Sequence, residues 1–127
     1  MSPSALHHVE LWVADLGAAR SQWGWLCGRL GWVVREHWPD GSSWGNGGTY
    51  LVVTTPPAIV DGEHDRRRSG MNHLAFTAEA ATVDAIAGGG GGWTALYADK
   101  FPHAGGAEHY AAYLENDAGF KVEIVAR

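Results

Sequence analysis

Three side chains of this sequence have the types and spacing that could hold a divalent metal ion. His8, His73 and Glu123 each lie in a short stretch of alternating apolar residues. In each stretch the apolar residues have the opposite parity, so the three polar side chains are expected to point away from the core. Two imidazoles and one carboxylate form a facial ligand set that leaves positions open for water, substrate or dioxygen. The pattern predicts a catalytic metal centre; the alternative is that each histidine is an ordinary core or surface residue.

The sequence around Glu123 strengthens the metal hypothesis. A glutamate in the run Lys-Val-Glu-Ile-Val opposes strand propensity. A carboxylate that faces a partly enclosed sheet is also costly unless it is paired or binds a metal. Strand parity also distinguishes His8 from its neighbour His7, because His7 has the same parity as the apolar residues Val9 and Leu11. We therefore expect His8 to be the ligand and His7 to face the core.

The elements that must position these residues occur in two similar halves. The alternation and the turn signals predict the order strand, helix, strand, strand, strand in each half, with Asp15 as the cap of the first helix. In the first half the expected strands are 6–13, 32–38, 42–46 and 50–55, with a helix from 16 to about 29. In the second half they are 72–78, about 93–97, 109–115 and 120–126, with a helix at about 79–87. An internal duplication is therefore expected.

Segments 6–16, 70–76 and 113–123 together resemble the vicinal oxygen chelate superfamily. This superfamily includes glyoxalase I, fosfomycin-resistance transferases, extradiol dioxygenases, epimerases and bleomycin-binding proteins. The resemblance implies an α+β fold in which two βαβββ modules form a curved mixed sheet around a metal-binding cavity. It also implies metal ligation by His8, His73 and Glu123, and a homodimer. The single domain 1–127 would comprise module one at about 5–56, a connector at about 57–70 and module two at about 71–127.

Two departures from relatives narrow the expected function. Glyoxalase I has a fourth ligand, a glutamate in the last strand of its first module, but residues 49–55 contain no acid. The bleomycin-binding branch lacks the metal ligands, so their presence here argues against a metal-free binding protein. Glu10 shares the face of His8 but lies about 6.6 Å along the strand. Glu10 therefore suits a role beside the ligands or on the substrate better than ligation.

The resemblance to extradiol dioxygenases rests on Tyr113, which precedes Glu123 by ten residues as in that branch. The turn between them also matches, except that Asp117 replaces a proline. This resemblance implies that Tyr113 hydrogen-bonds a bound phenolate and that His103 or His109 is a general acid and base. The spacing of both histidines departs from that of the family, and simple packing of Tyr113 is the alternative.

The composition limits the partners. A net charge of −5 argues against nucleic acid, and the absence of a long apolar run argues against a membrane span. The single cysteine allows no intrachain disulfide, which fits the cytoplasm. Trp12 shares the parity of His8, and Trp38 and Trp44 are expected to share its cavity. These rings favour a flat or hydrophobic small-molecule substrate.

The sequence thus predicts a metal-dependent enzyme that acts on a small substrate with two neighbouring oxygens. Ring-cleaving dioxygenation is the leading expectation, which favours Fe(II) or Mn(II); Zn(II) or Ni(II) would favour lyase or isomerase chemistry of the glyoxalase type. An antibiotic-binding or resistance protein of the same fold is the main alternative, and a structural binding module is the third. The glycine-rich loop 100–106 could serve as a lid.

Overall fold

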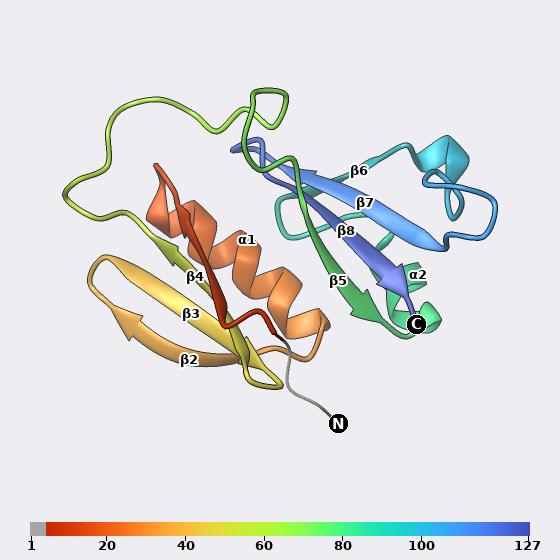
Figure 1. Ribbon diagram of the computed structural model, residues 1–127, viewed down its shortest axis with the longest axis horizontal. Coiled ribbons are helices and arrows are strands. Elements are labelled where there is room, and N and C mark those ends of the chain that lie inside the picture. The colour runs from red at the N-terminus through yellow and green to blue at the C-terminus, as the bar shows by residue number, and fades with distance from the viewer. Residues whose placement is uncertain (1–4) are drawn as a thin grey trace. The chain divides into compact units, whose positions relative to one another are not determined.

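The computed structural model describes residues 5–127 (Figure 1). They form two α+β units, and the boundary along the chain lies between Gly62 and Glu63. The elements of the first unit are β1 (His8–Trp12), α1 (Leu16–Arg29), β2 (Val33–Trp38), β3 (Gly41–Asn46) and β4 (Thr49–Thr54). Those of the second are β5 (Leu74–Ala78), α2 (Ala80–Ile86), β6 (Trp93–Leu96), the 3₁₀ turn η1 (Ala98–Lys100), β7 (Ala111–Asn116) and β8 (Lys121–Ala126). The α+β class and the repeated strand and helix order are confirmed.

Each unit contains one four-stranded mixed sheet. The strand orders are β1-β4-β3-β2 and β5-β8-β7-β6, with β1 parallel to β4 and β5 parallel to β8. All other neighbours are antiparallel and consecutive in the chain; their connections are short except that between β6 and β7, which contains η1 and a loop. The parallel pair therefore joins the first and last strands of each unit, and it places residues from the two ends of a unit side by side.

Helix α1 begins where the sequence predicts. The carboxylate of Asp15 accepts a hydrogen bond of 3.0 Å from the backbone N–H of Ala18, which caps the helix. The buried side of α1 includes Trp23, Leu26 and Cys27, each fully buried. Burial raises the pKa of the Cys27 thiol to about 12. This helix therefore forms the core of the first unit, and its thiol is unreactive at neutral pH.

In the second unit the apolar face of the sheet packs against α2. Val83 and Ile86 of this helix are buried, as are Leu114, Val122 and Ile124 of the strands beneath it. Because side chains alternate along a strand, the residues between these positions occupy the opposite face. That second face carries the polar residues described next. No helix in residues 5–127 is long and apolar enough to cross a bilayer.

Candidate metal and substrate site

Glu123 is the centre of a polar cluster in the second unit. It lies in β8, directly opposite Ala75 of β5 and Tyr113 of β7, and it is only 7% exposed. Its Oε1 lies 3.1 Å from Nε2 of His73, and its Oε2 contacts Nε2 of His109 and accepts a hydrogen bond of 3.1 Å from the hydroxyl of Tyr113. The sheet register places the phenol beside this buried carboxylate, and the segments just before β5 and β7 bring the two imidazoles to it.

The surroundings of Glu123 favour its charged form. Burial alone would raise its pKa, but the contacts with His109, Tyr113 and His73 outweigh burial and hold the pKa of Glu123 below its usual value. The pKa of Tyr113 moves the other way, to about 12, because of its burial and then because of the adjacent carboxylate. Glu123 is thus an anion at neutral pH, and Tyr113 keeps its proton.

Asn72 fixes which nitrogen of His73 can bind a metal. The side-chain amide of Asn72 donates to the backbone carbonyl of Arg66 at 3.0 Å, so its Oδ1 is the atom that faces Nδ1 of His73 at 2.7 Å. An amide oxygen only accepts, so Nδ1 of His73 carries the proton. In a neutral imidazole Nε2 then presents a lone pair toward Oε1 of Glu123. A lone pair and a carboxylate oxygen repel each other unless the ring is protonated or a cation binds both.

The two histidines proposed as acid and base differ in position. His109 contacts Glu123, whereas Nδ1 of His103 lies 3.3 Å from the backbone carbonyl of His109, and its ring packs against Tyr110. His103 therefore points at a backbone carbonyl and at the half-buried ring of Tyr110 rather than at the carboxylate. The structure separates two residues that the sequence left as equal candidates, and only His109 joins the cluster.

His8 lies in the first unit, where its ring stacks on Tyr50. The two residues are register partners in β1 and β4, with ring centroids 4.8 Å apart and planes 4° from parallel. Nδ1 of His8 contacts Nδ1 of His7 at 2.8 Å. The expectation that His7 faces the core is wrong: β1 begins only at His8, and His7 is exposed with its ring against those of His8 and Tyr50. Strand parity does not apply to a residue outside the strand.

The other residues proposed for the first unit divide between the two faces of its sheet. Glu10 and Trp12 share the face of His8, and Glu10 accepts a hydrogen bond of 2.7 Å from Nε1 of Trp12, which is 48% exposed. Trp38 is on the same face, because the register links it through β3 and β4 to Trp12. Trp44 has the opposite parity and is 3% exposed in the core beneath α1. The fold thus places Trp44 away from the face that carries His8.

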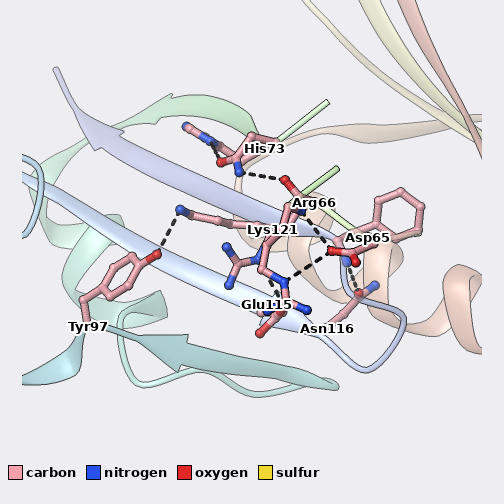
Figure 2. A network of polar contacts seen from close by, with 10 residues as sticks. Asp65, Arg66, His73, Tyr97, Glu115, Asn116 and Lys121 are labelled. Atoms are coloured by element: carbon pink, nitrogen blue, oxygen red, sulfur yellow. Dashed lines mark hydrogen bonds and ion pairs between the residues drawn. The ribbon is translucent and has the colours of Figure 1, made fainter. Parts of the chain in front are cut away.

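Sequence reasoning missed a second polar group on the face of Glu123. Figure 2 shows Lys121 bonded to Tyr97, and Arg66 beside Glu115. The ammonium of Lys121 donates to the hydroxyl of Tyr97 at 3.1 Å, and Nε of Arg66 lies 3.2 Å from Oε1 of Glu115. The hydrogen bond from Lys121 is the main reason that the pKa of Tyr97 lies below its usual value. Lys121 shares the parity of Glu123 in β8, which was the available signal.

The donor set fits a divalent metal in its chemistry. His73 offers an imidazole nitrogen and Glu123 a carboxylate oxygen, the ligand types that Zn, Fe, Mn and Ni sites use. A neutral His73 that presents the lone pair of Nε2 to this carboxylate would form a pair that a cation stabilises. In residues 5–127, however, no three His, Cys, Asp or Glu side chains are arranged to hold a metal ion by themselves. The metal centre thus remains a proposal.

Comparison with known proteins shows the family. The sequence profile of the Glyoxalase/Bleomycin resistance protein/Dioxygenase superfamily matches residues 7–113. The chain belongs to this superfamily. It is 41% identical over 125 residues to the uncharacterized protein YqjT of Bacillus subtilis (strain 168), a match that covers 95% of this chain and 98% of that protein. The resemblance to the vicinal oxygen chelate superfamily is thereby confirmed.

Solved structures of relatives share the fold. A candidate glyoxalase from Bacillus halodurans is 40% identical, with a TM-score of 0.88 over 97% of this chain and 96% of that chain. The fosfomycin resistance protein FosX from Listeria monocytogenes has a TM-score of 0.62 at 16% identity, over 98% and 92% of the two chains. Lactoylglutathione lyase from Agrobacterium tumefaciens has a TM-score of 0.59 at 20% identity, over 99% and 96%. The last two matches show the fold alone.

Proposed function

We propose that this protein is a metal-dependent enzyme that acts on a small substrate with two neighbouring oxygens. The observation that carries the proposal is the convergence of His73, His109 and Tyr113 on the buried carboxylate of Glu123. His73 and Glu123 are the ligands that the second unit supplies, and His8 is assigned as the third ligand from its position in the sequence. A divalent metal held there would act as a Lewis acid for the two substrate oxygens.

The residues beside the two proposed ligands suit proton transfer. The pKa of Tyr113 is about 12, so its hydroxyl remains a donor and can hydrogen-bond an oxyanion of the substrate. The side chain of His109 is 40% exposed, and histidine is the residue that enzymes use most often for proton transfer. His109 is therefore proposed to pass a proton between the substrate and water. His103, which lacks a contact with Glu123, is not needed for this step.

We propose ring cleavage of a catechol-like compound as the leading reaction. Three protein ligands leave room for two substrate oxygens and dioxygen, and Tyr113 lies where it can steady a phenolate. Trp12 and Trp38, which share the face of His8, are proposed to contact an aromatic ring. Glu10 is proposed to orient Trp12 through their hydrogen bond. Fe(II) or Mn(II) is the metal that this reaction requires.

Isomerisation of the glyoxalase type is the second candidate. The relative from Bacillus halodurans, at 40% identity, supports it. The lack of an acid in residues 49–55 stands against it, because the fourth ligand of glyoxalase I has no counterpart there. Zn(II) or Ni(II) would accompany this reaction.

The test of the leading reaction is oxygen uptake by untagged protein loaded with Fe(II) under anaerobic conditions. A panel of catechols is compared with methylglyoxal plus glutathione, and metal content is measured by elemental analysis. We expect Tyr113→Phe to lower turnover without lowering metal content, and Glu123→Gln to lower both. Turnover of the hemithioacetal with no uptake on any catechol would replace the leading reaction by the second candidate.

The metal site itself has a separate test. Removal of a ligand by His73→Ala or Glu123→Gln should weaken metal binding more than about 100-fold, since even changing a residue that only orients a ligand costs 10- to 100-fold. Parental metal content in both variants would show that the assignment of ligands is incorrect. This measurement does not depend on knowing the substrate.

We further propose a homodimer in which His8 of one subunit completes the ligand set of the other. Equal mixing of His8→Ala and Glu123→Gln protein would then restore about a quarter of the metal sites, because half of the dimers are mixed and each has one intact site. A monomer by light scattering that retains full metal occupancy would exclude a shared site.

A further inference from the structure

Lys121 is a buried cation whose ammonium group is only partly satisfied. The residue is 8% exposed, and its Nζ donates one hydrogen bond, of 3.1 Å, to the hydroxyl of Tyr97. Its other close contacts are the rings of Tyr97 and Tyr113, whose centroids lie 5.1 and 5.2 Å away. An ammonium group has three N–H donors. Within residues 5–127, one of them has an oxygen acceptor, and the aromatic faces supply only a diffuse attraction.

The carboxylates of this sheet face are engaged elsewhere. Glu115, the register partner of Lys121 in β7, pairs with Arg66 at 3.2 Å. Glu123 contacts His73, His109 and Tyr113. Lys121 forms no ion pair with a carboxylate in the described part of the chain. A buried ammonium without a counter-ion costs stability, because the charge has left water without compensation.

The neighbours of Lys121 keep its ammonium in this position. Tyr97 is the only non-glycine residue of segment 5–127 with a positive φ, and its backbone at φ 55° and ψ 34° lies in the left-handed region. This unfavourable conformation accompanies the placement of its hydroxyl on Lys121. Because that hydroxyl accepts from Nζ, its own proton remains available for another acceptor. The pair therefore presents N–H and O–H donors from one place (Figure 2).

We propose that Lys121 and Tyr97 bind an anionic group of the substrate, a carboxylate or a phosphate. The proposal rests on the proposed function for the remainder of the substrate. Lys121 precedes Glu123 by two residues on the same face of β8, which separates their Cα atoms by about 7 Å. Tyr113 connects the two positions, since its ring lies beside Nζ and its hydroxyl bonds Glu123. In a catechol that carries an acidic group on its ring, a comparable distance separates that group from the two neighbouring hydroxyl oxygens.

The charge of this sheet face supports the same substrate class. Lys121 and Arg66 balance Glu115 and Glu123. A divalent cation bound by Glu123 would leave the face doubly positive, and a substrate with two neighbouring oxygens and a further anionic group would neutralise that charge. Arg66 also helps to lower the pKa of Tyr97, but its charge is paired with that of Glu115. Lys121 has no carboxylate partner in residues 5–127.

The experiment compares acid and amide probes of the same shape by titration calorimetry. The probes are 3,4-dihydroxybenzoate and 3,4-dihydroxybenzamide with the metal-loaded protein, and benzoate and benzamide with the metal-free protein. Phenyl phosphate and phenol form the phosphate arm. Hydrogen bonds to charged groups contribute about 1.5–3 kcal/mol, so the anionic probe should bind roughly 10- to 150-fold more tightly than its neutral counterpart. The arm with the larger ratio identifies carboxylate or phosphate as the preferred group.

The variants assign this preference to Lys121. Lys121→Met should reduce the ratio to about one, and it should raise the unfolding temperature because an uncompensated charge is replaced by an apolar side chain of similar length. Lys121→Arg should retain the preference for the anion. Lys100→Met is the matched control, since Lys100 is the other lysine of the chain and is exposed in η1. This control should bind both probes as the parent does.

Two results would overturn the inference: a ratio below about threefold in the parent protein, or an unchanged ratio in Lys121→Met. Failure of the proposed function is distinguishable, because Lys121→Met should keep the metal content of the parent. Loss of metal binding in the parent would leave the comparison of benzoate with benzamide intact. Conversely, a parent that binds metal but does not distinguish acid from amide would refute only the role of Lys121.

Discussion

Gly105 offers a sharp test of the cluster around Glu123, because this glycine touches the cluster from a loop. A Cβ atom added to Gly105 would lie 2.5 Å from the hydroxyl oxygen of Tyr113 and 2.6 Å from Cδ2 of His109. Ordinary contacts begin near 3.4 Å, so the hydroxyl of Tyr113 would have to move by about 0.9 Å and the ring of His109 by about 0.8 Å. The Tyr113 hydroxyl bonds Glu123 at 3.1 Å, and we expect the shift to lengthen or misalign this hydrogen bond.

The expected cost of Gly105→Ala follows from that displaced hydroxyl. Overpacking of a well-packed site costs about 1–3 kcal/mol, and a hydrogen bond to a charged acceptor contributes about 1.5–3 kcal/mol. We therefore expect Gly105→Ala to reduce the free energy of unfolding by roughly 1–3 kcal/mol. A misplacement of about 1 Å also costs about 100-fold in turnover when the displaced groups act on the substrate.

A double-mutant cycle with Tyr113→Phe identifies the clash as the cause. Removal of the phenol oxygen removes the 2.5 Å contact, so Gly105→Ala should cost at least about 1 kcal/mol less in the Tyr113→Phe background than in the parent. Urea unfolding followed by tryptophan fluorescence measures the four stabilities. Additive costs, or an unchanged stability of Gly105→Ala, would refute the placement of Gly105 against the hydroxyl of Tyr113.

Three further predictions concern other parts of the chain. His8→Ala should abolish metal binding, whereas His7→Ala should leave the metal affinity within a factor of a few of that of the parent. Elemental analysis measures the metal content, and the reverse result would show that His8 is not the ligand. The pKa of Glu123 is lowered by folding, so the contribution of this carboxylate to stability is present above the ordinary value of 4.5 and is lost as the pH falls below it. Urea titrations should therefore show that Glu123→Gln loses less stability on acidification than the parent. Parallel pH profiles of the two proteins would contradict this. Gly28→Ala in α1 should stabilise the chain by about 0.5–1 kcal/mol, because a Cβ there meets nothing within 4 Å; a lower thermal midpoint would contradict it.

The fold could be predicted because the sequence patterns are local and repeated. Alternation marks β1, β5 and β8, and Asp15 marks the start of α1. Parity within β8 was enough to orient Glu123. The same reasoning failed for the segment that became β3, because its Ser-Ser-Trp-Gly sequence has no apolar alternation. The face of Trp44 therefore could not be read from its neighbours, and the structure places it in the core.

Long-range contacts explain the rest of what the sequence could not show. His103 and His109 lie in a stretch rich in glycine and alanine with no periodicity, so only the folded loop distinguishes them. Lys121 shows its parity in the sequence, but its aromatic neighbours are Tyr97, which follows β6, and Tyr113 of β7. Which carboxylates are already paired is likewise a property of the assembled sheet. Hence a candidate ligand could be found from local pattern, whereas its polar neighbours could not.

The sheet registers of the two units differ at the positions that bear on the proposed metal ligands. In the second unit the strand residue two positions after His73 lies opposite Glu123. In the first unit the residue two positions after His8 lies opposite Val52, which is 6% exposed. The position that carries a carboxylate in one half of the duplication is therefore apolar in the other. At these paired positions the first unit has no acid in β4, and the carboxylate on that face is Glu10 of β1.

The next strand in each sheet supplies the physical reason for this difference. Glu123 has Tyr113 as its partner in β7, and the phenol donates to it. Val52 has Ser43 as its partner in β3, and the buried hydroxyl of Ser43 has no hydrogen-bond partner in residues 5–127. A buried carboxylate is tolerated only where donors surround it. An acid and a phenolic donor are therefore both absent at these positions of the first unit, which agrees with the proposed set of three ligands rather than the four that glyoxalase I uses.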